Sequence, residues 1–178
     1  MNLKLKTALL IGLVAFFFVT TAHAVSLDWV DKDTTIVVDS TFQISKPNTR
    51  WDTQTKHYED PAPVKWVRHV RGPNPQIFLR YRENVTGKTA HVYSKQVRKE
   101  LQSRGYQVYK TEKKVINNRH VAILHASSGN DKVMVGVWRH RNLGFWLECR
   151  ADGAKFSEYM SEFNRAIASV KIVKESGL

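Results

Sequence analysis

The sequence from Val108 to Arg150 alternates extended segments with tight-turn signals, and this pattern constrains the fold more than any other feature. Asn117-Asn118 separates the first two segments, and asparagine pairs tolerate the positive φ angles that a two-residue turn requires. A polar stretch at 127–131 separates the second segment from the third. The sequence therefore predicts a run of antiparallel strands covering 108–116, 119–126, 132–140 and 145–150.

The last hairpin of this run is predicted to close through Asn142-Leu143-Gly144, with the glycine in the left-handed position of a three-residue loop. That loop sets the register of the two strands. It pairs Arg141 with Phe145, Val137 with Cys149, and Trp138 with Glu148. One face then carries Val133, Val135, Val137, Phe145, Leu147 and Cys149, and the other carries Met134, Gly136, Trp138, His140, Trp146, Glu148 and Arg150.

An amphipathic helix is predicted on each side of the strand run. The first has an apolar stripe at three- and four-residue spacing, and Gly105 suits the left-handed residue after its end. The second covers 154–169, with Asp152 as its N-cap. The two stripes consist of Ala90, Tyr93, Val97 and Leu101, and of Phe156, Tyr159, Met160, Phe163, Ile167 and Val170.

Before the first helix, four further extended segments are predicted at 35–38, 41–45, 64–71 and 76–82. The stretch 48–63, which contains Trp51 and Tyr58, is predicted to be a surface loop. In 76–82, the side chains of Ile77, Leu79 and Tyr81 fall on one side, and those of Phe78, Arg80 and Arg82 on the other. Together these elements predict an α+β domain, with a mostly antiparallel sheet flanked by helices as an αβα sandwich.

The N-terminus has the pattern of a secretory signal peptide. Lys4 and Lys6 precede an apolar run from Ala8 to Val19, and Ala22-His23-Ala24 follows as a small-residue cleavage site. We expect residues 1–24 to be removed, leaving a single domain at 25–178 without a transmembrane segment. An uncleaved membrane anchor is the alternative, but the apolar run is shorter than the roughly 20 residues that span a bilayer.

The chain is strongly basic, with 28 Lys and Arg against 16 Asp and Glu and a net charge of +12. An exported basic protein of a bacterium reaches a periplasmic or secreted location. There it meets anionic lipids, lipopolysaccharide, teichoic acids and acidic glycans rather than genomic nucleic acid. The expected partner is therefore an envelope protein or an anionic envelope polymer, and nucleic acid is the less favoured partner.

Motifs that carry catalysis or bind metal are not found in the sequence. It has no G-x-S-x-G, H-E-x-x-H, Gly-rich phosphate loop or Cys-x-x-Cys. The single cysteine, Cys149, is expected to be a buried, inert thiol rather than a reactive or dimer-forming one. His120 and His125 should point to opposite faces of their strand, and the stretch His57–Asp60 is interpreted as a solvated loop rather than a weak metal site. We expect no catalytic residues, metal or cofactor.

The most suggestive side chains are arginines interleaved with aromatic residues. Arginine donates forked hydrogen bonds to phosphates and carboxylates, and tryptophan can stack on sugars, bases or cations. Two interpretations are open: the tryptophans pack beneath helices as core residues, or the whole set faces a ligand. The candidate ligand-binding residues are Trp66, Arg68, Arg71, Arg80, Arg82, Trp138, Arg139, His140, Arg141 and Trp146.

The order of elements resembles the PsbP-like family, which includes photosystem extrinsic proteins, Ran-binding import factors and exported bacterial proteins such as DcrB. The resemblance is carried by Phe42-Gln-Ile-Ser-Lys-Pro47 followed by Trp51, by the helix through Leu101 and Gly105, by the strand run, and by Ile167-Ala-Ser-Val170. It implies an antiparallel sheet flanked by helices and a non-catalytic binding or assembly role. No functional residue of the family has a counterpart motif in this sequence.

Three functions remain as hypotheses. The first is an exported, non-enzymatic binding or accessory domain of the cell envelope. The second is a binder of anionic polymers (acidic glycan, lipopolysaccharide or nucleic acid) through a basic-aromatic face. The third is a hydrolase whose catalytic residues come from distant positions in the sequence.

Overall fold

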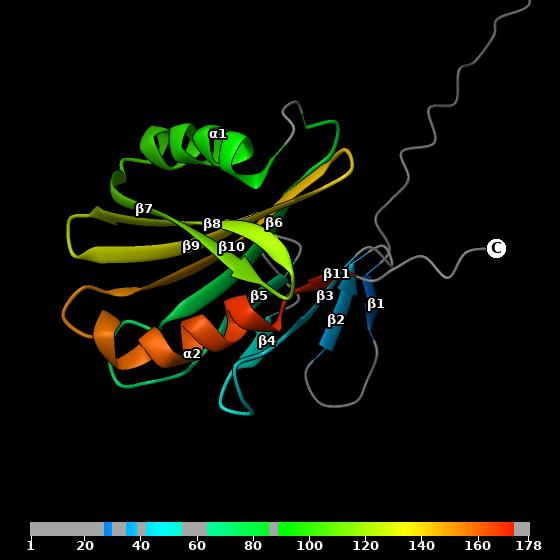
Figure 1. The fold of residues 1–178 in the computed structure, drawn as a ribbon. Coiled ribbons are helices and arrows are strands. Elements are labelled where there is room, and N and C mark those ends of the chain that lie inside the picture. Colours follow the sequence, from blue (N-terminus) through cyan, green and yellow to red (C-terminus); the bar gives the residue numbers. More distant parts are fainter. Residues whose placement is uncertain (1–26, 30–34, 39–41, 55–63, 86–88, 173–178) are drawn as a thin grey trace, which may run out of the picture.

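The computed structural model of the chain describes residues 27–29, 35–38, 42–54, 64–85 and 89–172. These residues form a large sheet with a helix on each side and a smaller sheet beside it (Figure 1). The predicted signal peptide, residues 1–24, lies outside the described ranges, and so does the stretch His57–Asp60. None of the helices in these ranges is long and apolar enough to cross a bilayer.

The large sheet has seven strands, and every neighbouring pair is antiparallel. The four strands that follow the first helix form a meander, which folds back so that its last strand lies beside β6. In spatial order the strands are β4 (Asp52–Gln54), β5 (Val64–Val67), β6 (Gln76–Arg82), β10 (Leu143–Asp152), β9 (Asp131–His140), β8 (Arg119–Ser128) and β7 (Gln107–Ile116).

The two helices cover opposite faces of this sheet and are offset along it. Helix α1 (Ala90–Ser103) packs against β7, β8 and β9, and Gly105 follows it with φ of +84°. Helix α2 (Phe156–Ser169) packs on the other face, against β9 and β10 (Figure 1). The predicted α+β fold, with a mostly antiparallel sheet flanked by helices, is confirmed.

The small sheet has the strand order β1 (Leu27–Trp29), β2 (Thr35–Val38), β3 (Phe42–Ser45) and β11 (Lys171–Ile172). Hydrogen bonds and core packing join it to the rest of the molecule. The Ser45 backbone N–H donates to Ser169 Oγ at 3.0 Å, and that hydroxyl lies 3.2 Å from the Ser45 carbonyl. Phe42 and Ile44 of β3 are fully buried in the core beneath α2.

The first turn of the meander matches its prediction. Asn117 and Asn118 have φ angles of 49° and 60°, and Ile116 lies opposite Arg119. Positive φ at both central residues is the geometry of a type I′ turn, whose twist matches that of the flanking strands. The two-residue hairpin predicted from the asparagine pair is therefore confirmed.

The predicted register of the last hairpin is wrong. His140 lies opposite Leu143, so the turn is Arg141-Asn142, with Arg141 at φ 53°. Trp138 consequently pairs with Phe145 and not with Glu148. The error spans three residues, and an odd shift exchanges the faces of one strand relative to the other. The face beneath α1 carries Val133, Val135, Val137 and Trp146, and the face beneath α2 carries Met134, Trp138, Phe145, Leu147 and Cys149.

The register prediction was wrong because Gly144 was assigned to the turn, whereas the structure requires a glycine there for packing. A Cβ atom at Gly144 would lie 2.4 Å from Cζ of Tyr93, a buried residue of α1. The glycine therefore lets the ring of Tyr93 lie directly on the backbone of β10. Its place within a strand, beside a helix that approaches closely, is a known use of glycine in sheets.

Other boundaries also differ from the predictions; the strand predicted at 64–71, for example, ends at Val67. Asp152 ends β10 and its Oδ1 accepts the Ala154 N–H at 2.9 Å, while α2 begins at Phe156 without a side-chain N-cap. The stretch 48–63 is not entirely a surface loop, because it contains strand β4. Trp51, immediately before that strand, is fully buried.

Cys149 lies in the core beneath α2 and is completely buried, as expected. Burial raises the pKa of its thiol well above the ordinary value, and the charge of Glu148 raises it further. Because the thiolate is the reactive form, we expect a thiol reagent such as DTNB to label the native protein at least about 100-fold more slowly than the urea-unfolded protein. Labelling of the native protein at the unfolded rate would contradict this placement.

Candidate functional site

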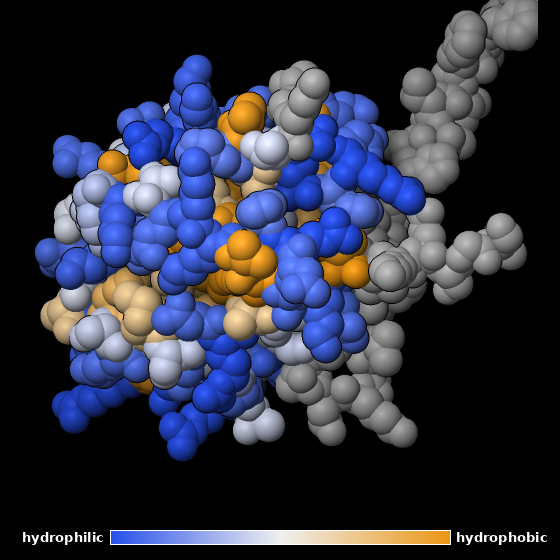
Figure 2. Space-filling model, viewed as in Figure 1, coloured by the Kyte–Doolittle hydropathy of each residue, from blue (hydrophilic) through white to orange (hydrophobic). Residues whose placement is uncertain are grey.

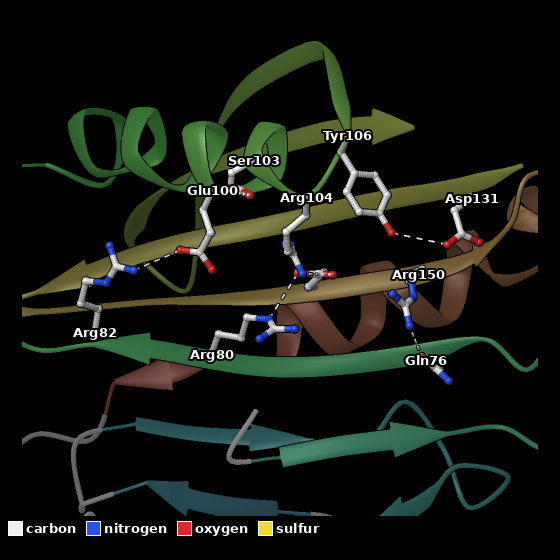
Figure 3. Close-up of polar contacts among 10 residues, drawn as sticks. Gln76, Arg80, Arg82, Glu100, Ser103, Arg104, Tyr106, Asp131 and Arg150 are labelled. Atoms are coloured by element: carbon white, nitrogen blue, oxygen red, sulfur yellow. Dashed lines mark hydrogen bonds and ion pairs between the residues drawn. The ribbon is translucent and has the colours of Figure 1, made fainter. Parts of the chain in front are cut away.

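Helix α1 is offset along the sheet, so neither α1 nor α2 covers part of the sheet face on the α1 side. This face belongs to β5, β6 and β10, on the same side as α1, and charged side chains cover it (Figure 3). Arg104, the C-cap residue that follows α1, reaches toward the same area. We call this surface the arginine patch; it comprises Lys65, Phe78, Arg80, Arg82, Arg104, Glu148 and Arg150.

A buried carboxylate lies at the centre of the arginine patch. Glu148 is fully buried and accepts two hydrogen bonds from Arg104, at 3.2 Å from Nη1 and 2.6 Å from Nη2. Arg80 Nε lies 3.4 Å from the same carboxylate. A buried charge is tolerated only when it is paired in this way. Burial alone would lower the pKa of Arg104, but the hydrogen bond and attraction to Glu148 outweigh it and raise that pKa above its ordinary value.

Cationic side chains surround the ring of Phe78. Lys65 Nζ and Arg80 Cζ each lie 5.4 Å from the ring centroid, and Arg150 Cζ lies 5.0 Å from it. These distances fit cation–π attraction, and the aliphatic stems of the three side chains shield the ring from water. Only 1% of Phe78 is exposed, so the ring serves as a support beneath the cations.

Polar contacts at the rim fix further side chains of the patch. Arg82 Nη2 lies 3.3 Å from Glu100 of α1, and Arg150 Nη2 donates to Gln76 Oε1 at 2.5 Å (Figure 3). Among the described residues, neither Lys65 nor Arg150 has a carboxylate within ion-pair distance. The patch therefore carries more positive than negative charge in a preorganised arrangement.

The structure brings together only two of the residues predicted from sequence. Arg80 and Arg82 both belong to the arginine patch. The three tryptophans are core residues, as the packing interpretation expects: Trp66 and Trp138 lie beneath α2, and Trp146 lies beneath α1.

The other predicted residues lie elsewhere. Arg68 pairs with Glu162 of α2, on the opposite side of the sheet, and Arg71 is exposed beyond β5. Arg139 Nη2 donates to the Val85 carbonyl at 3.2 Å. His140 and Arg141 end β9 and begin its turn.

Five members of the patch were not predicted: Lys65, Phe78, Arg104, Glu148 and Arg150. Alternation along β6 already placed Phe78 with Arg80 and Arg82, as the structure shows. The missing information was the pairing of β6 with β10, which sets Glu148 opposite Phe78 and Arg150 opposite Gln76. These strands are separated by a helix and three strands in the chain, so no local signal reveals their pairing.

A separate ion pair, on the α2 side of the sheet, stabilises the packing of that helix. Glu162 accepts from Arg68 Nη1 at 2.6 Å and from Trp51 Nε1 at 2.7 Å. Burial alone would raise the pKa of Glu162, but the hydrogen bonds from Trp51 and Arg68 outweigh it and hold that pKa below its ordinary value.

We therefore expect Glu162→Gln to lower the free energy of unfolding by about 1–2 kcal/mol at neutral pH. A carboxyl group with a depressed pKa stabilises the fold above its unfolded-state pKa, and this stabilisation is lost as the pH falls through the folded-state value. The difference between wild type and Glu162→Gln should thus shrink in urea titrations as the pH falls below 4.5. Glu158→Gln, at an exposed position of the same helix, is the control. A pH-independent difference would contradict the assignment.

The described residues contain no group of three or more His, Cys, Asp or Glu side chains placed to bind a metal ion. His120 and His125 lie opposite Val115 and Lys110, on opposite faces of the sheet, as expected. The exposed large hydrophobic side chains in the described ranges are Val92, Tyr109 and Val115. Hydrophilic residues predominate on the face shown in Figure 2. Charge, rather than apolar area, distinguishes the arginine patch as a candidate binding surface.

Protein-family models and curated protein sequences give no match for the chain. Solved structures do match its fold. Cyanobacterial PsbP (CyanoP) from Synechocystis sp. PCC 6803 has a TM-score of 0.54 and 11% identity, over 75% of this chain and 87% of that one. LpqN, involved in cell envelope biogenesis of Mycobacterium tuberculosis, has a TM-score of 0.56 and 16% identity, over 75% of this chain and 83% of that one. At these identities the likeness is one of fold.

Proposed function

We propose that this PsbP-like chain is an exported, non-enzymatic accessory domain of the bacterial cell envelope, located in the periplasm or secreted. The observation that carries the proposal is the excess positive charge of the arginine patch on a part of the sheet face that neither α1 nor α2 covers. Its cations are held in place by Glu148, Gln76 and Phe78, so little side-chain entropy is lost when a partner binds.

Two further observations support a binding role over catalysis. The one thiol, Cys149, is buried and has a raised pKa, which suits a core residue and not a nucleophile. The buried carboxylate of the patch, Glu148, is neutralised by Arg104 and Arg80 and makes structural contacts with both. The fold neighbour LpqN is involved in cell envelope biogenesis, which agrees with an envelope role.

Export is tested by expressing the full chain in a bacterial host and sequencing the N-terminus of the accumulated protein. We expect the chain to begin at Val25 and to appear in the periplasmic or culture fraction. Retention of the full-length chain in the cytoplasm would contradict export.

Envelope binding is tested by sedimentation of the purified protein with isolated envelopes. The variant Lys65→Gln/Arg150→Gln removes the two patch cations that have no carboxylate partner among the described residues. We expect it to bind about tenfold more weakly than wild type. Lys113→Gln/Arg119→Gln is the matched control, because it removes two exposed cations from β7 and β8 at the far end of the sheet. Equal sedimentation of all three proteins would contradict the role of the patch.

A second candidate function, binding of an anionic polymer, is favoured by one specific observation. The patch presents guanidinium groups from β6 and β10 together with the ammonium group of Lys65, and guanidinium forks suit carboxylates and phosphates. Binding that falls steeply with salt would support this function, while sedimentation unaffected by salt would favour an envelope protein as the partner.

A further inference from the structure

The cations of the arginine patch lie in a row along β6. Arg82, Arg80, Phe78 and Gln76 are successive residues on one face of this strand, spaced about 7 Å apart. Neighbouring strands continue the row where β6 has no cation of its own. Lys65 of β5 lies opposite Phe78, and Arg150 of β10 lies opposite Gln76. Each of these four positions along β6 therefore has a positive side chain on it or directly beside it, over a length of about 20 Å.

Helix α1 forms a raised wall along one side of this row. Arg104 and Glu100 reach from it toward the strands, as Figure 3 shows. The helix rises about 10 Å above the sheet. Helix α1 stands above the sheet in Figure 1, so a flat lipid surface would contact the helix before the side chains of β6, and this favours a narrow extended chain.

The chemistry of the row favours sugars over bases or dense phosphate. Phe78 is only 1% exposed, so it offers no open ring on which a nucleic-acid base could stack. The side chain of Glu100, 28% exposed, can accept hydrogen bonds from hydroxyl groups, but it repels a polymer with closely spaced charges. A ligand that alternates carboxylates with hydroxyl groups satisfies both the cations and this acceptor.

We propose that the arginine patch binds a linear acidic polysaccharide, laid along β6 beside α1, with its carboxylates on Arg82, Lys65 and Arg150. This inference rests on the proposed function, because it names the ligand of the same surface. The polymer contacts the outer edges of the Arg82 and Arg150 guanidinium groups, whose inner edges are fixed by Glu100 and Gln76.

The test is calorimetric titration of the protein, purified from the fraction in which it accumulates, with polygalacturonate oligomers of increasing length. We expect affinity to rise with length until the oligomer spans the row, about 20 Å, and then to level off. Lys65→Gln/Arg150→Gln should bind about tenfold more weakly and reduce the slope of log affinity against log salt, while Lys113→Gln/Arg119→Gln should stay within about twofold of wild type. Arg82→Gln, whose parent side chain is 56% exposed, should weaken binding with unchanged thermal stability.

Three results would overturn the inference. One is an equal loss in the control variant, which would indicate nonspecific attraction. Another is equal or tighter binding of polyphosphate or of phosphatidylserine vesicles. The third is affinity that does not depend on oligomer length. If the protein does not bind polygalacturonate but still sediments with envelopes in a patch-dependent way, only the polysaccharide assignment is rejected. If neither binding is observed, the proposed function is rejected as well.

Discussion

Phe145→Ala is expected to lower the free energy of unfolding by about 3–5 kcal/mol, a large part of the stability of an ordinary domain. Phe145 is fully buried at the centre of a three-ring stack. Its ring lies 4.1 Å from that of Phe42, centroid to centroid, with an interplanar angle of 6°. The ring of Trp138, directly opposite on β9, lies 5.5 Å away at 4°.

The expected loss of stability is large because the ring stack joins the two sheets. Phe42 belongs to the small sheet, whereas Phe145 and Trp138 belong to the large one. The neighbouring rings are rigid and buried, so they cannot collapse into the space that a missing phenyl group leaves. Truncation therefore removes hydrophobic burial and leaves a cavity at the junction of the sheets.

Urea unfolding followed by circular dichroism measures this effect. Tyr109→Ala, which truncates an aromatic side chain that is 60% exposed, is the control and should change stability by less than about 1 kcal/mol. The free energy of unfolding of Phe145→Leu should lie between that of Phe145→Ala and that of wild type, because leucine fills part of the cavity. A loss below about 1 kcal/mol for Phe145→Ala would contradict the placement of the ring.

Glu148→Gln is the second change with a large expected effect. The substitution keeps the shape of the side chain but removes the charge that neutralises Arg104 and Arg80, and we expect a loss of about 3–4 kcal/mol. The two guanidinium groups would then repel each other beside a fully buried amide. The side chains of Arg80 and Arg104 are 14% and 30% exposed, so water can relieve only part of this repulsion.

The matched control is Glu83→Gln, an exposed position at the end of β6, which should change stability by less than about 0.5 kcal/mol. Glu148→Gln combined with Arg104→Gln should recover part of the loss, since the second change removes one of the two repelling charges. Additive losses in the double variant would show that Glu148 does not act through Arg104.

Local patterns were enough to predict most individual elements. The stripe through Tyr93 and Leu101 predicted α1, and the asparagine pair at 117–118 predicted its turn, because both signals come from residues a few positions apart. Alternation along β6 also separated the core residues from the charged ones. These predictions depend on backbone periodicity, which neighbouring residues alone determine.

Pairing between distant strands was not predictable in the same way. The position of Gly144 suggested a loop, but its true cause is the ring of Tyr93, some fifty residues earlier in the chain. The resulting error in register assigned the wrong faces to one strand of the hairpin. Without the strand pairing, sequence alone can group arginines only by their position in the chain. The predicted binding residues therefore include Arg68 and Arg139, which lie outside the arginine patch.

The sequence by itself determined the fold class, the amphipathic faces of both helices and the basic character of the chain, because each depends on composition or on local spacing. Only the tertiary structure decided which charges meet. Pairing of β6 with β10 sets Arg80 beside Glu148 and Gln76 opposite Arg150, and α1 is offset so that it does not cover this face. Such long-range pairing is selected by packing of the whole core, in which a single glycine or a buried carboxylate can decide between alternative registers.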